Sequence, residues 1–375
     1  MKNILIIGGA GFIGSNITAK LADKGYNVTI FDSLSSQVHG KRNKSSLYSS
    51  VKNIADVIIG DVCNKDDWGN ILSDKDAVIY LAAETGTAQS MYEITKYNQT
   101  NILGLSNFYE NLITSKYSLK KIIIASSRSI YGEGKYYSDK YGFVYPSGRN
   151  ERDLLNQDFN VKCSISKLNL KAVATDEESK INPSSIYAIS KYQQEQISFL
   201  MGKTLDISTV ALRYQNVYGP GQSLTNPYTG ILSVFSTRIL NNNDIDIYED
   251  GNQSRDFVYI DDVVDATILA LERDAENQIF NVGSGTPITV YDVAKILKEV
   301  YKSNVNIKIS NNFRIGDIRH NYADLTKISS ELGFEPKIGF RDGINRFVKW
   351  VKTQKIANDK YNDSIQELKD KRLFR

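Results

Sequence analysis

Residues 4–14 read Ile-Leu-Ile-Ile-Gly-Gly-Ala-Gly-Phe-Ile-Gly, and this stretch decides the fold. A short apolar run that ends in glycine and continues with helical spacing predicts a strand, a tight turn and a helix. The spaced glycines let the backbone turn, approach a ligand and pack the helix on the strand, and free N–H groups at the helix start attract a pyrophosphate. A glycine turn without a ligand would give the same pattern, so the rest of the chain must decide. The residues predicted to bind a dinucleotide here are Gly8, Gly11, Phe12, Ile13 and Gly14.

The second predicted strand, residues 27–31, ends at Asp32, about twenty residues after the glycine turn. An acidic residue at this place accepts hydrogen bonds from the adenosine ribose hydroxyls, and its charge repels a 2′-phosphate. Asp32 therefore favours NAD over NADP as the cofactor. The alternative is a strand-terminal aspartate that only caps a loop.

Further apolar segments predict strands at residues 56–62, 77–83, 121–127 and 207–213, with helical spacing between them, as at 99–116. This alternation predicts an α/β fold with a doubly wound, Rossmann-type parallel sheet. Ligands of such sheets bind beyond the carboxyl ends of the strands. Besides Asp32, the residues expected at those ends are Asp61, Val62, Leu81, Ala82, Ala83 and Ser127.

At 375 residues, the chain is long enough for two units. We expect a dinucleotide-binding domain at 1–213 and a smaller, interleaved C-terminal substrate lobe at 214–375, with segments near 243–282 returning to the first domain. Residues 33–50 are polar and predict a loop with one helical turn. Residues 132–182 have weak periodicity and predict an insertion, either a small hairpin or a lid. Residues 352–375 predict a charged helical tail.

Composition excludes several classes of protein. The chain is 41% hydrophobic and 24% charged, as in ordinary globular proteins, and its net charge of +3 comes with no basic block of the kind that binds nucleic acid. No apolar run is long enough for a membrane span, and the N-terminus lacks a signal-peptide pattern. Two distant cysteines, Cys63 and Cys163, and only two histidines predict no metal site and fit a cytoplasmic protein.

A tyrosine and a lysine provide the candidate chemistry. Residues 181–191 open a predicted helix that runs to about Met201, and Tyr187 and Lys191 lie four apart on it, on one face. Tyrosine has a pKa of about 10 and needs a nearby cation to act as a base near neutrality. Lys191 and the positive nicotinamide ring of NAD are expected to lower the pKa, and Ser127 to orient the substrate hydroxyl. Alone, the pair would more simply be an amphipathic helix face.

These motifs occur in the order found in a known family. The chain resembles an extended short-chain dehydrogenase/reductase. The motifs that carry this resemblance are the glycine turn, Asp32, residues 81–83, residues 126–132, the Tyr187–Lys191 pair and residues 213–220. Within that family the chain resembles the nucleotide-sugar epimerases and dehydratases. Residues 81–92, 126–134 and 316–320 are most similar to those of dTDP-L-rhamnose 4-epimerase-like proteins.

The resemblance implies roles for the site residues. Tyr187 would be the general base, Lys191 its electrostatic partner and a ligand of the cofactor ribose, and Ser127 the group that orients the substrate. The resemblance also implies a substrate-binding set that holds the sugar nucleotide and its diphosphate; it consists of Ser127, Arg128, Asn216, Arg255 and Arg314.

Two departures from the family pattern matter. The 4,6-dehydratases carry Asp-Glu where this chain has Arg128 and Ser129, so dehydration loses its acid and base. The insertion resembles one that carries metal-binding cysteines in the rhamnose 4-epimerase-like proteins, but only Cys163 lies in it here, and no metal is inferred.

The expected activity is thus NAD-dependent 4-epimerisation of a nucleotide sugar through a transient 4-keto intermediate, for surface polysaccharide biosynthesis. The alternatives are a 4,6-dehydratase, a 2-epimerase or a 4-ketoreductase on the same scaffold, and, in another class, a non-catalytic NAD-sensing scaffold. The family pattern also predicts a homodimer formed through the helices near 99–116 and 187–201.

Overall fold

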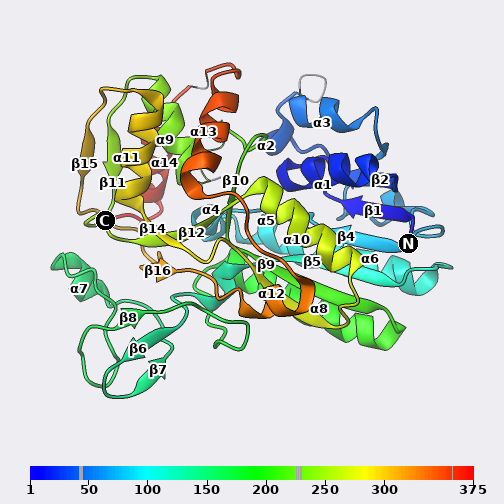
Figure 1. Cartoon of the computed structure of the whole chain (residues 1–375), viewed down its shortest axis with the longest axis horizontal. Helices are drawn as coiled ribbons and strands as arrows, with labels where there is room; N and C mark the ends of the chain where they lie inside the picture. Colours follow the sequence, from blue (N-terminus) through cyan, green and yellow to red (C-terminus); the bar gives the residue numbers. More distant parts are fainter. Residues whose placement is uncertain (42–44, 225, 227, 229, 357) are drawn as a thin grey trace.

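The computed structural model describes residues 1–41, 45–224, 226, 228, 230–356 and 358–375. Within these residues, seven parallel strands form one sheet in the order β3–β2–β1–β4–β5–β9–β13 (Figure 1). This order confirms the predicted Rossmann-type fold. The strands are β1 (Asn3–Ile7), β2 (Asn27–Asp32), β3 (Asp56–Ile59), β4 (Ala77–Tyr80), β5 (Lys121–Ser127), β9 (Ser208–Tyr214) and β13 (Gln278–Val282).

Helices cover both faces of the sheet, because the central strands present apolar side chains to both faces. In β1, Ile4 and Ile6 belong to the core on one face, and Leu5 and Ile7 to the core on the other. The first face is covered by α1 (Phe12–Asp23), α3 (Ser46–Val51) and α10 (Ile260–Glu272). The second is covered by a π-helical turn η3 (Gln99–Leu103), α6 (Gly104–Thr114) and α8 (Ile186–Leu205).

Two predicted strands end earlier in the structure than the apolar pattern suggested. β3 stops at Ile59, before Gly60, where an added Cβ would lie 2.4 Å from the Phe31 ring. β4 stops at Tyr80, because the next two amides both donate to the last carbonyl of β1, at 2.8 and 3.0 Å. Asp61, Val62, Leu81, Ala82 and Ala83 therefore lie in the loops that follow the strands.

Most of the C-terminal part forms a lobe beside the carboxyl ends of the strands (Figure 1). β13 and α10 are exceptions, since they belong to the main sheet layer. The strands of the lobe are β10 (Asn216–Tyr218), β11 (Ile245–Ile247), β12 (Ser254–Tyr259), β14 (Pro287–Thr289), β15 (Ile307–Ile309) and β16 (His320–Asn321). Its helices are α9 (Ile231–Leu240), α11 (Val290–Tyr301), α13 (Phe340–Val351) and α14 (Tyr361–Asp370), while α12 (Thr326–Leu332) packs beside β13.

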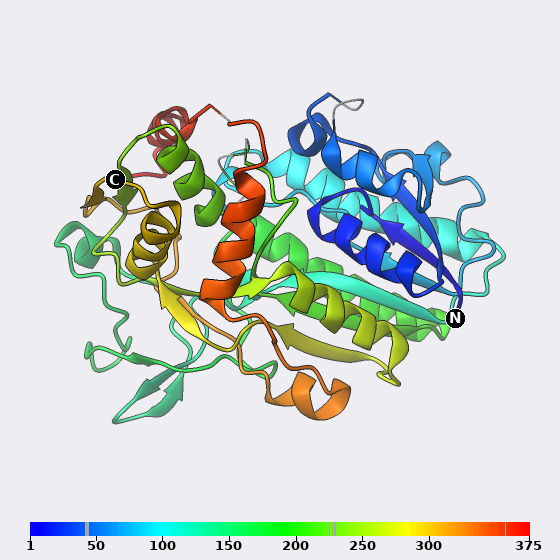
Figure 2. The ribbon, with the colours of Figure 1, turned by 45° about the horizontal axis from the view of Figure 1, so that its top comes forward.

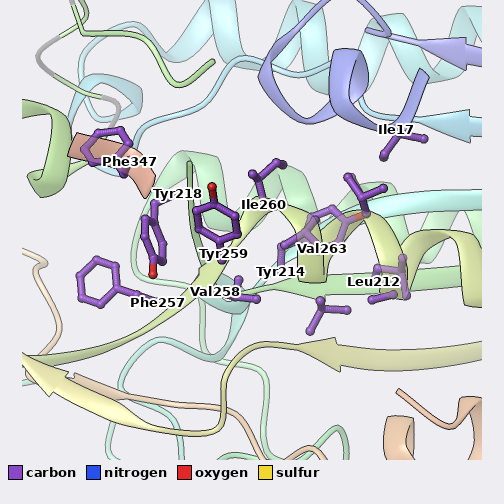
Figure 3. Close-up of a cluster of buried hydrophobic side chains, with 14 of the residues drawn as sticks. Ile17, Leu212, Tyr214, Tyr218, Phe257, Val258, Tyr259, Ile260, Val263 and Phe347 are labelled. Atoms are coloured by element: carbon purple, nitrogen blue, oxygen red, sulfur yellow. The ribbon is translucent and has the colours of Figure 1, made fainter. Parts of the chain in front are cut away.

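One apolar core continues from the sheet layer into the lobe. Figure 3 shows part of it, with Leu212 and Tyr214 of β9 at one side and Tyr218, Phe257 and Phe347 towards the lobe. The Tyr218 ring contacts several aromatic rings, with centroids 5.5–6.5 Å apart. The lobe is therefore joined to the sheet by buried hydrophobic surface.

The insertion has its own small elements. Residues 132–182, all of them described, contain a three-stranded antiparallel sheet of β6 (Tyr136–Ser138), β7 (Gly142–Val144) and β8 (Lys171–Ala172), and a short helix, α7 (Glu151–Leu155). β6 and β7 form a hairpin, which extends from the body of the molecule on the side of the lobe (Figure 2).

Two predictions, of a loop at 33–50 and of a helical tail at 352–375, need correction. The polar stretch 33–50 contains two short helices, α2 (Ser36–His39) and α3; residues 42–44 lie outside the described part. The tail is only partly helical: α13 ends at Val351, α14 follows, and residues 373–375 pair with residues 313–315 in an extended conformation. The remaining short elements are η2 (Lys65–Trp68), α4 (Thr87–Ser90), α5 (Ile94–Asn98) and η4 (Arg128–Tyr131).

We predict that Gly14→Ala destabilises the fold. A Cβ at Gly14 would lie 2.4 Å from the Gly8 carbonyl oxygen and 2.6 Å from the Gly9 Cα, so backbone must shift. Such overpacking costs about 1–3 kcal/mol, to be measured by urea unfolding. Gly339→Ala is the matched control, because a Cβ added there would have no described atom within 4 Å. Equal stability of the two variants would contradict the close contact.

Candidate active site

A cavity of about 910 Å³ lies beyond the carboxyl ends of the central strands, between the sheet and the lobe. Every residue predicted for cofactor or substrate lines it, although these residues come from distant parts of the chain. They are Gly8, Gly11, Phe12, Ile13, Gly14, Asp32, Asp61, Val62, Leu81, Ala82, Ala83, Ser127, Arg128, Tyr187, Lys191, Asn216, Arg255 and Arg314.

The glycine turn opens towards this cavity. Gly8 has a φ of +82°, and a Cβ there would lie 2.8 Å from the Ala82 nitrogen, so only glycine fits. At Gly11 the only described atom within 4 Å of an added Cβ would be the Gly8 carbonyl oxygen, at 3.4 Å. The first turn of α1, residues 12–15, carries no acidic side chain. These features suit the pyrophosphate of a dinucleotide, which needs close backbone approach and the positive helix end.

Asp32 connects the glycine turn to β2. Its carboxylate accepts hydrogen bonds from the Ala10 and Leu34 amides, at 3.0 and 2.8 Å. It therefore caps its own loop, as the alternative interpretation held, and at the same time lines the cavity at the end of the strand. The position beside the glycine turn is the one that a ribose-binding carboxylate requires.

Tyr187 lies in the first turn of α8, which begins there because the Ser185 hydroxyl accepts the Ala188 amide at 3.1 Å. Burial raises the pKa of Tyr187, and a hydrogen bond with Ser127 and the positive charge of Arg128 oppose that rise. Lys191 is not among the groups that oppose the rise, so the expectation that it lowers this pKa is wrong. The reason is that the Lys191 ammonium turns to Gln194, to which it donates at 2.6 Å.

Lys191 is itself strongly perturbed. Burial lowers its pKa to about 7, and the nearby Glu195 carboxylate partly opposes this. Glu195 is fully buried and receives two hydrogen bonds of 2.9 Å from Arg213, and one from Ser126. Sequence reasoning missed Gln194 and Glu195, although Glu195 lies one helical turn after Lys191 on the same face.

The other end of the cavity is positively charged. Asp317 binds both predicted phosphate ligands, Arg255 at 3.3 Å and Arg314 at 2.9 Å. The hydrogen bond from Arg128 to Asn216 is long, at 3.5 Å, and burial together with Arg255 lowers the pKa of Arg128 to about 9. Three guanidinium groups thus lie near Asp317, and such groups suit an anionic substrate.

Two hydrogen-bond donors at this end of the cavity are available to a ligand. The Asn216 Nδ2 and Arg314 Nε atoms are buried and have no hydrogen-bond partner among the described residues. The Arg314 guanidinium also lies over the Tyr248 ring, 5.4 Å from its centroid, and Tyr248 lines the cavity. Sequence reasoning missed Asp317 as the partner of both arginines and missed Tyr248. The spacing of Arg314 and Asp317, three residues apart, could have indicated the first.

Among the described residues, the side chains form no group of three or more His, Cys, Asp or Glu that could bind a metal ion. None of the helices in the same part of the chain combines the length and the apolar character needed to span a membrane.

Comparison with known proteins agrees with the geometry. A family model described as the NAD dependent epimerase/dehydratase family matches residues 4–149 and 166–283. The chain is 34% identical to a dTDP-L-rhamnose 4-epimerase of Burkholderia thailandensis, over 93% of this chain and 95% of that protein. It is 32% identical to a putative UDP-glucose 4-epimerase of Methanocaldococcus jannaschii, over 93% and 98% of the two chains.

Comparison with a solved structure indicates the same family. The UDP-glucose 4-epimerase of Thermotoga maritima, determined with UDP-glucose, superimposes with a TM-score of 0.76 at 31% identity, over 94% of this chain and 99% of that one. The resemblance inferred from the motifs is therefore confirmed, and the chain, with its glycine turn, Tyr187–Lys191 pair and Rossmann-type sheet, belongs to the NAD-dependent epimerase/dehydratase family.

Proposed function

We propose that this protein is an NAD-dependent nucleotide-sugar 4-epimerase. One observation carries the proposal: a single cavity joins the glycine turn, Tyr187 with Ser127, and the arginine-rich end at Asp317. A dinucleotide at the first, a sugar at the second and a diphosphate at the third would lie in one continuous space. The related 4-epimerases support the same conclusion.

The residues of the chain would act as follows. NAD, when bound, supplies reversible hydride acceptance at carbon 4 of the sugar. Tyr187 takes the proton of the 4-hydroxyl as that carbon is oxidised and returns it afterwards, while Ser127 orients the hydroxyl. Lys191 holds the cofactor ribose, and Arg128 stabilises the tyrosinate electrostatically. Arg255 and Arg314 hold the diphosphate while the 4-keto sugar turns its other face.

The substrate would be a UDP- or dTDP-activated hexose, since the related 4-epimerases are named for such sugars. We place its product in surface polysaccharide biosynthesis. The two cysteines, Cys63 and Cys163, are unpaired. Free thiols fit the reducing cytoplasm that we propose as the place of action.

The other chemistries of this scaffold are less well supported. A 4,6-dehydratase needs an acid and a base where Arg128 and Ser129 stand, and a buried arginine cannot remove a proton from the sugar. A 2-epimerase or a 4-ketoreductase would use the same cofactor pocket, so only reaction products separate them. A non-catalytic NAD sensor would not need the Tyr187–Lys191 pair.

We expect the purified protein to interconvert one or more members of a panel of UDP-, dTDP-, GDP- and CDP-sugars, followed by NMR. In heavy water a 4-epimerase leaves the carbon-bound hydrogens of the sugar unexchanged, because the hydride stays within the site. Deuterium at carbon 5 or 6 would indicate a dehydratase or 5-epimerase instead. Stoichiometric consumption of NADH or NADPH would indicate a ketoreductase, and no turnover of any sugar would favour a sensor.

Tyr187→Phe is expected to lower kcat by about 10²- to 10⁴-fold, the usual contribution of a general base. NAD content, measured after denaturation of the purified variant, should stay unchanged. Tyr192→Phe is the matched control, because Tyr192 is a partly exposed tyrosine of the same helix and does not line the cavity. Full activity of Tyr187→Phe would contradict the proposed base.

We also propose a homodimer. Several apolar side chains are 41–65% exposed along the helices near residues 99–116 and 187–201: Leu103, Ile113, Ile189 and Leu200. An exposed apolar face of this kind is typical of a surface that a second copy covers.

Size-exclusion chromatography with light scattering should give twice the mass of one chain. Leu200→Glu should shift the protein towards the monomer, because a charge would be buried in the interface. Leu155→Glu, in the exposed helix α7 of the insertion, should leave the assembly unchanged. A monomeric wild type would refute the proposal.

A further inference from the structure

A cluster of charges, buried except for the partly exposed Asp250, joins the insertion to the lobe outside the cavity. It consists of Glu133 and Arg149 from the insertion and Glu249, Asp250 and Arg319 from the lobe; we call it the Arg149 cluster. The side chains of Arg149 and Glu249 are only 2% and 4% exposed. Removing such charges from water is costly, and the ion pairs of the cluster offset part of that cost.

Arg149 makes the central contacts of the cluster. Its Nη1 and Nη2 atoms donate to the two Glu249 carboxylate oxygens, both at 2.8 Å, in a two-pronged pair. Its Nη2 also donates to the backbone carbonyl oxygen of Asp317 at 2.9 Å. The insertion thereby holds the backbone of the very residue that binds both cavity arginines.

Asp317 is thus a junction between the insertion and the cavity. Its carbonyl oxygen accepts Arg149, and its carboxylate binds Arg255 and Arg314. The neighbouring residue Arg319 is held in turn, because its side chain donates to Glu249 and Asp250 at 2.7–2.8 Å. The carbonyl of Arg319 accepts Arg255 Nη1 at 3.0 Å.

An apolar contact reinforces the polar one. Leu154 and Phe159 of the insertion form a small buried cluster with Phe313, the residue before Arg314. Arg149 Nη1 also lies 3.4 Å from the Phe159 carbonyl oxygen. The insertion therefore contacts the loop 313–319 at both ends of the segment that carries Arg314 and Asp317.

We propose that Arg149 is a positioning residue for nucleoside-diphosphate binding: through Asp317 it sets the places of Arg255 and Arg314, although it does not itself line the cavity. This inference rests on the proposed function and gives the insertion a part in it. The diphosphate would arrive at arginines that are already fixed, which lowers the ordering cost of binding.

Two variants test this role. Arg149→Met combined with Glu249→Gln removes both charges of the pair and leaves Arg319 its partner Asp250. Arg149→Lys keeps the charge but loses the two-pronged geometry. Arg152→Gln is the matched control, because Arg152 is an exposed arginine in α7 of the same insertion. Thermal unfolding and NAD content show whether each variant is folded and cofactor-loaded.

The main readout is the affinity of the NAD-loaded protein for UDP and dTDP, measured by calorimetry. We expect the double variant to bind both about tenfold more weakly, within the usual range of coupling in a shared ionic network, and Arg149→Lys to lose less. KM for the nucleotide sugar should rise by a similar factor, with kcat within about threefold of wild type. NAD content should not change.

Unchanged affinity of the double variant for UDP and dTDP would overturn the inference and leave the proposed function standing. An equal fall in kcat with KM constant would also overturn it. A wild-type protein that binds neither nucleoside diphosphate would overturn the proposed function, and the inference with it.

Discussion

The backbone contact between Gly8 and Gly14 is the constraint on which the rest depends. Since neither residue carries a Cβ, α1 lies directly against the end of β1, and its N-terminus lines the cavity beyond the strands. The same close approach brings Ala82, after β4, against Gly8. The Asp32 carboxylate then accepts a hydrogen bond from the Ala10 amide. The carboxyl ends of the neighbouring strands β2, β1 and β4 therefore surround one opening. The cofactor end of the cavity can form because Gly8 and Gly14 have no side chain.

The substrate end depends on charges instead. A buried charge is tolerated when it is paired, as Glu195 and Arg213 are, or when its pKa shifts, as that of Lys191 does. Around Asp317 the arginines outnumber the carboxylate, and this imbalance suits a diphosphate. Burial lowers the pKa of both Lys191 and Arg128, so each of these charges is held in the site at a cost.

Local signals in the sequence predicted the sheet, the glycine turn, Asp32 and the Tyr187–Lys191 pair, because each rests on spacing within one strand or helix. The strand ends at Ile59 and Tyr80 were mispredicted, since the apolar pattern does not show where the regular ladder of hydrogen bonds ends. The pairing of Arg149 with Glu249 could not be predicted. These residues lie 100 positions apart, and no periodicity connects them. The direction of the Lys191 side chain was likewise decided by Gln194, a contact that spacing alone does not specify.

The extended pairing of residues 373–375 with residues 313–315 has a consequence for how the protein is made. Its hydrogen bonds, 2.9–3.1 Å long, flank Arg314 on both sides. A chain leaves the ribosome from its N-terminus, and domains begin to fold during synthesis. The glycine turn, Asp32, Ser127 and Tyr187 thus emerge well before the strand that supports Arg314. The backbone support of Arg314 is thus complete only after residues 373–375 have been synthesised.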